Sequence, residues 1–200
     1  MAVVCYHYFP RLEFHWQNEN GALYFSNDAT LLAKYQALPA STLRWSDLLP
    51  DSEKQLLSQY QTRNNVDFSE QLALSLQASA DKDYKNALYS TNIVADKLEQ
   101  PVSISGFIVP LELDDERNIL SFFLVPYFGA CIHYPPPPPN QIIFVQLEPG
   151  FKNTQLFNPF TLSGILQQGL FEDPLGTSAY QLNVVSIREF VGQPDDFRQH

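Results

Sequence analysis

The run Val102-Ser-Ile-Ser-Gly106-Phe-Ile108 decides the fold, and the run Phe160-Thr-Leu-Ser-Gly164-Ile-Leu166 resembles it. Each run alternates apolar and hydroxyl side chains before it reaches a glycine, which is the two-residue period of a strand with one buried face. A glycine weakens a strand unless the backbone must bend or bulge there, and a small closed barrel requires such bends. The two runs therefore predict strands that bend at Gly106 and at Gly164.

Three further runs of β-branched and aromatic residues accompany these two, and turns rich in proline, glycine and acidic residues separate them. The five runs cover residues 102–111, 119–125, 142–147, 160–166 and 179–187. Their length and spacing predict an antiparallel all-β unit. Because bends are expected in the first and fourth strands, we expect a five-stranded, OB-like antiparallel barrel.

Residues 1–86 differ from the rest of the chain in their pattern of apolar and polar residues. Aromatic residues are frequent up to Pro39 but follow no sustained period, so we expect an irregular aromatic arm. Acidic residues after Pro50, and apolar residues at every fourth position from Phe68, predict a helical section. The polar run 78–86 predicts a loop or linker. The expected fold class is mainly β with an α-helical N-terminal section (α+β), with the arm and helices in residues 1–86 and the barrel in residues 87–200.

Composition limits the classes of function. A hydrophobic share of 44% with 17% charged residues is typical of a folded chain. The formal net charge of −10 argues against binding to nucleic acid or anionic lipid, because both need clustered basic residues. No apolar run approaches the ~18 residues that span a bilayer, and no secretory signal peptide is visible at the start of the sequence.

The most distinctive stretch joins the second and third predicted strands. It reads Leu124-Val-Pro-Tyr-Phe-Gly-Ala-Cys131-Ile-His133-Tyr, followed by five prolines from Pro135 to Pro139. Side chains two residues apart in an extended segment share a face, so we expect Cys131 and His133 to point the same way. The proline run predicts a stiff polyproline II segment without internal backbone donors.

Polar and aromatic residues flank this proline run. Asn140 and Gln141 follow it directly, and Tyr134 precedes it. A stiff segment loses little entropy on binding and can hold its neighbours at fixed separations. The candidate binding or interaction residues are therefore Tyr127, Tyr134, Asn140 and Gln141.

Three kinds of site fit Cys131 and His133. A cysteine thiolate and a neutral imidazole are ligands for zinc or copper(I), and Glu112 at the end of the first strand could add a carboxylate. A structural zinc takes four ligands, so further ligands would come from distant sequence, water or a partner chain. Alternatively, Cys131 is the nucleophile of a thiol-dependent enzyme. In the third interpretation the stretch is structural or serves an interaction, because cysteine is often a core residue.

A resemblance to a known family rests on three segments. Trp45-Ser-Asp-Leu-Leu-Pro50, the run from Val102 to Glu112, and the stretch from Phe123 to Gln141 resemble the bacterial domain-of-unknown-function family numbered three-two-nine-nine. The resemblance covers about Trp45 to Ile187. It implies an OB-like fold, export to the periplasm, and genes near transport systems, some of them connected with zinc.

Taken together, these observations predict a non-enzymatic accessory or binding protein of the cell envelope. The cofactor stays open, with zinc as the candidate metal, and the resemblance implies a membrane transporter or another envelope protein as the partner. Thiol-dependent catalysis at Cys131 and a purely structural or interaction role are the alternatives. Periplasmic localisation rests on the resemblance alone.

Overall fold

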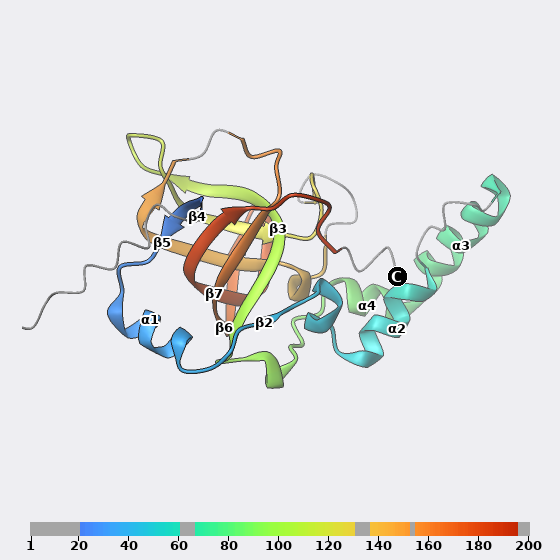
Figure 1. The fold of residues 1–200 in the computed structure, drawn as a ribbon. Helices are drawn as coiled ribbons and strands as arrows, with labels where there is room; N and C mark the ends of the chain where they lie inside the picture. The colour runs from blue at the N-terminus through green and yellow to red at the C-terminus, as the bar shows by residue number, and fades with distance from the viewer. Residues whose placement is uncertain (1–20, 61–66, 131–136, 153–154, 196–200) are drawn as a thin grey trace, which may run out of the picture.

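Five long strands form a closed barrel in the computed structural model, which describes residues 21–60, 67–130, 137–152 and 155–195 (Figure 1). Each of the five predicted runs falls on one of these strands, and only Ile142, the first residue of the third run, precedes its strand. The strands are β3 (Pro101–Leu113), β4 (Ile119–Val125), β5 (Ile143–Phe151), β6 (Phe160–Asp173) and β7 (Gly176–Glu189). The predicted β-rich α+β fold and five-stranded barrel are therefore confirmed.

The strand directions differ from the expectation in one pair. Around the ring, β3 pairs with β4, β4 with β5, β6 with β7 and β3 with β6, all antiparallel. The ring closes through a parallel pairing of β5 with β7, in which Ile143 faces Tyr180. A closed ring with an odd number of strands cannot alternate direction throughout. The purely antiparallel expectation was wrong for this reason.

Strand pairing changes at both glycines where bends are predicted. At Gly106, β3 changes partner, because residues up to Gly106 pair with β6 and residues from Phe107 pair with β4. A side-chain carbon at Gly106 would lie 2.6 Å from the Val125 carbonyl oxygen. At Gly164 the register with β7 shifts, and such a carbon would lie 2.2 Å from the Asn183 carbonyl oxygen. The strands approach so closely at both positions that only glycine fits.

The N-terminal part is more regular than the sequence indicated. The stretch that follows residue 20 forms β1 (Ala22–Phe25), α1 (Ala29–Gln36) and β2 (Ser41–Thr42). β1 pairs antiparallel with β7 and β2 pairs parallel with β3, so these strands extend the barrel sheet. They are too short to show a period in the sequence, and their pairing with distant strands is what makes them regular.

Short helices lie beside one end of the barrel, and α3 projects away from it (Figure 1). The helical elements are the 3-10 turn η1 (Trp45–Leu48), then α2 (Asp51–Gln59), α3 (Phe68–Ala80), α4 (Lys82–Leu88), and the 3-10 turns η2 (Ala95–Lys97) and η3 (Pro139–Gln141). The run 78–86, expected to be a linker, is helical except at Asp81. The Asp81 side chain accepts hydrogen bonds from the backbone N–H groups of Asp83 and Tyr84 and so begins α4. The boundary expected between residues 86 and 87 falls inside α4.

Two apolar clusters occupy the two faces of the barrel wall. The interior contains side chains from all five strands together with Trp45 and Leu48 of η1. A second cluster lies on the outer face of β3, β4 and β5 and is centred on Phe123 and Phe144. Alternation along β4 explains the division, because Phe122 and Leu124 belong to the first cluster while Phe123 and Val125 belong to the second.

Candidate functional site

The loop between β4 and β5 holds most of the predicted site residues, and the structure describes its two ends. Ala130 is fully buried at the first end. Residues 137–141 are buried at the second end, where η3 leads into β5. Cys131, His133 and Tyr134 lie outside the described residues. Tyr127 packs against the outer cluster of the barrel.

Asn140 makes a buried contact with a residue of the helical section. Its side-chain nitrogen Nδ2 donates to Oε2 of Glu53 at 2.7 Å and to the backbone oxygen of Asn92 at 3.0 Å. Glu53 lies on α2 and is only 6% exposed, and Asn140 is fully buried. A motif residue at the end of the proline run is therefore tied to a helix 87 positions away in the sequence.

The buried side chain of Glu53 accepts three hydrogen bonds. Its Oε1 atom accepts from the Ser90 hydroxyl at 2.6 Å and from Nδ2 of Asn92 at 2.7 Å, while Oε2 accepts from Asn140. No basic side chain forms an ion pair with Glu53 among the described residues. Three neutral donors therefore compensate for the loss of water around this carboxylate.

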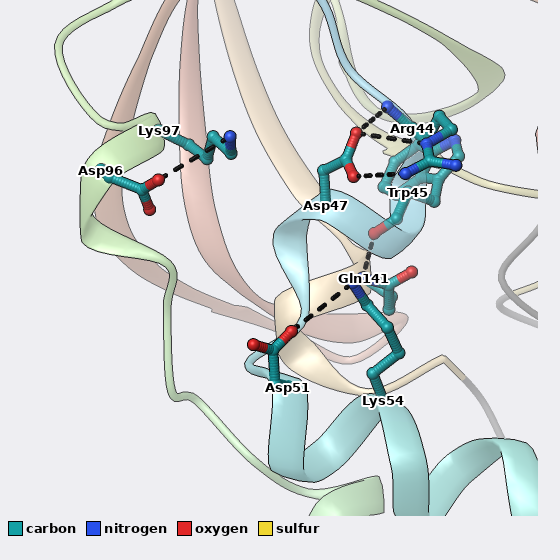
Figure 2. A network of polar contacts seen from close by, with 8 residues as sticks. All are labelled: Arg44, Trp45, Asp47, Asp51, Lys54, Asp96, Lys97 and Gln141. Atoms are coloured by element: carbon teal, nitrogen blue, oxygen red, sulfur yellow. Dashed lines mark hydrogen bonds and ion pairs between the residues drawn. The ribbon is translucent and has the colours of Figure 1, made fainter.

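Gln141 connects the same loop end to the 3-10 turn η1. Figure 2 shows its side chain reaching the Trp45 carbonyl, and Nε2 donates to that oxygen at 2.9 Å. The indole nitrogen of Trp45 in turn donates to the Ser105 carbonyl on β3 at 2.8 Å. On the same turn, Arg44 pairs with Asp47 at 3.1 Å. Burial opposes ionisation of Asp47, but the hydrogen bonds and charge of Arg44 outweigh it and lower the pKa of Asp47.

Tyr180 of β7 joins the barrel to the segments that contain Leu48 and Val94. Its hydroxyl donates to the Leu48 carbonyl at 2.9 Å and accepts from the Val94 N–H at 2.7 Å. The ring is fully buried in the barrel core. Burial raises the pKa of Tyr180 to about 12, although the hydrogen bond from Val94 acts in the opposite direction. The phenol is therefore neutral and able to donate at physiological pH.

The loop end also presents two buried acceptors. Asn140 Oδ1 and Gln141 Oε1 are buried and have no hydrogen-bond partner in the part of the chain that the structure describes. Both amides use their nitrogens for the contacts described above. The arrangement is suited to fixing the second end of the loop, because the amide nitrogens of Asn140 and Gln141 donate to acceptors within the fold. The predicted binding role of Asn140 and Gln141 stays a prediction.

Glu112, the third predicted metal ligand, lies on β3 and is exposed. Its Oε2 accepts from the Ser121 hydroxyl of β4 at 3.0 Å. Within residues 21–60, 67–130, 137–152 and 155–195, no three His, Cys, Asp or Glu side chains gather closely enough to hold a metal ion. Because Cys131 and His133 lie outside these ranges, the metal site stays a prediction.

The face that binds ligands in many OB barrels is covered here by the protein's own side chains. That face is formed by the second and third barrel strands, here β4 and β5, between two loops. Phe171 of β6 stacks on Phe144 of β5 with ring centroids 3.8 Å apart, and it also contacts Phe123 of β4. The far end of the β6–β7 hairpin thus occupies the surface on which bases stack in nucleic-acid-binding relatives of the fold.

Sequence reasoning missed the residues that organise the loop end from outside the motif. Glu53 lies among the acidic residues that follow Pro50, and Tyr180 lies in the fifth predicted strand, but neither position was predicted to contact the loop. Ser90 and Asn92 lie in a stretch without a regular period. A buried hydrogen bond between distant segments leaves no local pattern, so no sequence signal identified this set.

The comparisons with known proteins are consistent with this geometry. In the described part of the chain, no helix has the length and apolar character needed to cross a membrane. No curated protein matches the chain significantly. A crystal structure of a DUF3299 family protein from Pseudomonas aeruginosa PAO1 resembles it with a TM-score of 0.56 and 26% sequence identity, covering 78% of this chain and 99% of that chain. The profile of the family described as "Protein of unknown function (DUF3299)" matches residues 45–189, and the chain therefore belongs to this family.

Proposed function

We propose that this protein is a non-enzymatic binding protein whose β4–β5 loop holds the ligand, and that the ligand is a zinc ion. One observation carries the proposal. The loop that contains Cys131 and His133 starts at buried Ala130 and ends at the buried pair Asn140 and Gln141. Both of its ends are therefore fixed to the folded body, which lowers the entropy that the loop loses when it binds.

The chemistry of the loop favours a soft or borderline metal. A cysteine thiolate and a histidine imidazole suit zinc and copper(I) better than magnesium or calcium, which prefer oxygen. Glu112 is the candidate carboxylate ligand, since its exposed side chain makes only the hydrogen bond from Ser121 among the described contacts. Water or a partner chain would supply the remaining coordination.

Metal content and affinity test this proposal. The full chain, purified without chelators, is expected to carry about one zinc per chain and to bind it with micromolar or tighter affinity. Cys131→Ser and His133→Ala are each expected to abolish this binding. Cys5→Ser and His200→Ala are matched controls that remove the same residue types elsewhere and should leave the affinity unchanged. A chain without stoichiometric zinc or copper, or equal losses in all four variants, would reject the metal.

A structural or interaction role for the motif is the second candidate. It is supported by Asn140 and Gln141, whose amide nitrogens donate only inward, to Glu53, Asn92, Trp45 and the Asn140 backbone oxygen. In that case Cys131→Ser should keep both the stability and the cellular role, and no metal should be found. Thiol-dependent catalysis is the remaining alternative. It predicts that Cys131 reacts with iodoacetamide faster than a free thiol does at neutral pH.

We place the protein in the periplasm, in association with a membrane transporter or another envelope protein, as part of the same proposal. The support is the family membership together with the export and gene neighbourhood that the resemblance implies. A full-length tagged chain, expressed in a bacterium that encodes it, should appear in the periplasmic fraction. Recovery with a cytoplasmic marker enzyme would contradict this location.

A further inference from the structure

The β6–β7 hairpin extends past the point where β3 covers its outer edge. β3 pairs with β6 only from Phe160 to Ile165. The pairing of β6 with β7 continues to Asp173, which faces Gly176 across the turn. Among the described residues, β6 therefore has a neighbouring strand on one side only over residues 167–173.

Glu99 explains why the chain before β3 does not continue along this edge. Its backbone N–H donates to the Leu166 carbonyl at 2.7 Å, and its φ of 59° lies in the left-handed region that residues other than glycine rarely adopt. The Glu99 side chain pairs with Lys34 of α1 and accepts from Nε2 of Gln167 at 2.9 Å. The chain thus turns at Glu99, and in the described part of the chain no strand follows β6 beyond that point on its outer side.

The two strands of the hairpin differ in exposure near its tip. Ser178 and Ala179 of β7 are buried, with exposed fractions of 0% and 3%. On β6, by contrast, Leu170 is 64% exposed. The exposed residues of β6 in this part are alternate ones, namely Gln168, Leu170 and Glu172. β7 is therefore the inner strand and β6 the outer strand, which a partner can reach.

The outer edge of β6 is only lightly protected against the addition of another strand. A strand edge without a partner presents backbone N–H and C=O groups that can pair with an extended segment. Proteins commonly block such edges with lysine, proline or a bulge. Here the register with β7 shifts once, between Gln168 and Phe171, but neither lysine nor proline occurs in residues 167–173.

Charge determines which kind of segment suits this edge. Glu172 is exposed, Asp173 ends the strand, and no basic residue occurs in residues 167–173. Opposite charges at facing positions stabilise a strand pair, whereas like charges destabilise it. The whole chain carries a formal net charge of −10, so two copies repel each other. A basic segment of another protein is therefore favoured over a second copy.

From these observations we infer that residues 167–173 of β6 bind an extended, basic segment of another protein by strand addition. The segment runs antiparallel to β6 and continues the line of β3, which is antiparallel to β6 on the same side. Backbone hydrogen bonds provide affinity, while a basic side chain opposite Glu172 and an apolar one opposite Leu170 provide specificity. The inference uses none of the residues proposed to hold zinc and does not depend on the location of the protein.

A short basic peptide tests this edge in the full chain. The probe is fluorescein-labelled Lys-Val-Lys-Val-Lys-Val-Lys, and its binding is measured by fluorescence anisotropy at low ionic strength. We expect saturable binding with micromolar affinity. A second probe has the same sequence and charge but carries N-methyl groups on alternate residues, which remove the backbone donors of one edge. This probe should not bind, because charge alone does not form a strand pair.

Two charge reversals locate the binding site. Glu172→Lys should weaken binding of the unmodified peptide by about fivefold or more. Glu116→Lys is the matched control, since it makes the same change at an exposed position of the β3–β4 turn, and it should leave the affinity within a factor of about two. In the wild type, the peptide should slow hydrogen exchange at the backbone amides of residues 168–172, which reports the edge without any substitution. Circular dichroism should show that both variants keep the fold.

Three results would overturn the inference. The first is that the unmodified peptide does not bind, or that the N-methylated peptide binds equally well. The second is that Glu172→Lys and Glu116→Lys weaken binding equally, or that hydrogen exchange slows elsewhere but not in residues 168–172. The third is that the wild-type chain forms dimers that Glu172→Lys alters while the peptide has no effect, which would assign the edge to a second copy.

Discussion

Oε2 of Glu53 and Nδ2 of Asn140 lie 2.7 Å apart in the protein interior, and this contact joins helix α2 to the end of the proline run. Glu53 belongs to the helical section and Asn140 to the connection between two barrel strands. One buried carboxylate thus holds together two parts of the chain that the sequence presents as separate sections.

Removing the Glu53 carboxylate is expected to destabilise the protein strongly. Glu53→Ala leaves the Ser90 hydroxyl and the side-chain amides of Asn92 and Asn140 without their acceptor. We expect a loss of about 2 to 4 kcal/mol in the free energy of unfolding, measured by urea denaturation. Glu70→Ala, at an exposed position of α3, should change it by less than about 0.5 kcal/mol. Equal effects at the two positions would contradict the role of Glu53.

Changing Asn140 to Asp is expected to destabilise the protein. Asn140→Asp removes the amide that donates to Oε2 of Glu53 and places a second acidic group beside it. In urea denaturation at pH 7 we expect a larger loss in the free energy of unfolding than in Asn140→Ala. Equal losses in the two variants would show that the two acidic groups do not interact.

The raised pKa of Tyr180 gives a prediction for alkaline pH. The folded chain holds the proton up to about pH 12, whereas an unfolded tyrosine loses it near 10. The stabilisation from this phenol is therefore complete below about pH 10 and is lost as pH rises toward 12, by roughly 2 to 3 kcal/mol.

The variant Tyr180→Phe checks that prediction. It removes the hydrogen bonds to Leu48 and from Val94, so it should cost about 1 to 3 kcal/mol at pH 7. This difference from the wild type should narrow above pH 10. In a spectrophotometric titration the variant should lack a late-ionising phenolate, and an unchanged late phase would assign that phase to another tyrosine.

Phe171→Ala is expected to open the outer face of the barrel. It removes the ring that stacks on Phe144 and contacts Phe123, at a cost of about 1 to 3 kcal/mol. Binding of the dye ANS should increase because both remaining rings become more exposed. Leu170→Ala changes the neighbouring, exposed residue and should leave dye binding at the wild-type level. If Phe171→Ala binds no more dye than the wild type, another segment covers this face.

The barrel was predictable because its signals are local. Alternation, run length and the two glycines that interrupt strands are all properties of a few consecutive residues, and they identified the five strands. The parallel closing pair between β5 and β7 was not recognised, since it follows from closing the ring. The short strands β1 and β2 were also missed, because partners more than fifty residues away make them regular.

The sequence by itself determined the barrel, the glycines at positions 106 and 164 where strand pairing changes, and the loop that gathers Cys131, His133, Asn140 and Gln141. Tertiary structure alone decided that Asn140 and Gln141 are buried and that Glu53, Trp45 and Tyr180 meet at their end of the loop. The physical reason is the range of each interaction. Strand periodicity and backbone sterics act over a few residues, whereas buried hydrogen bonds join residues that are close only after the chain has folded.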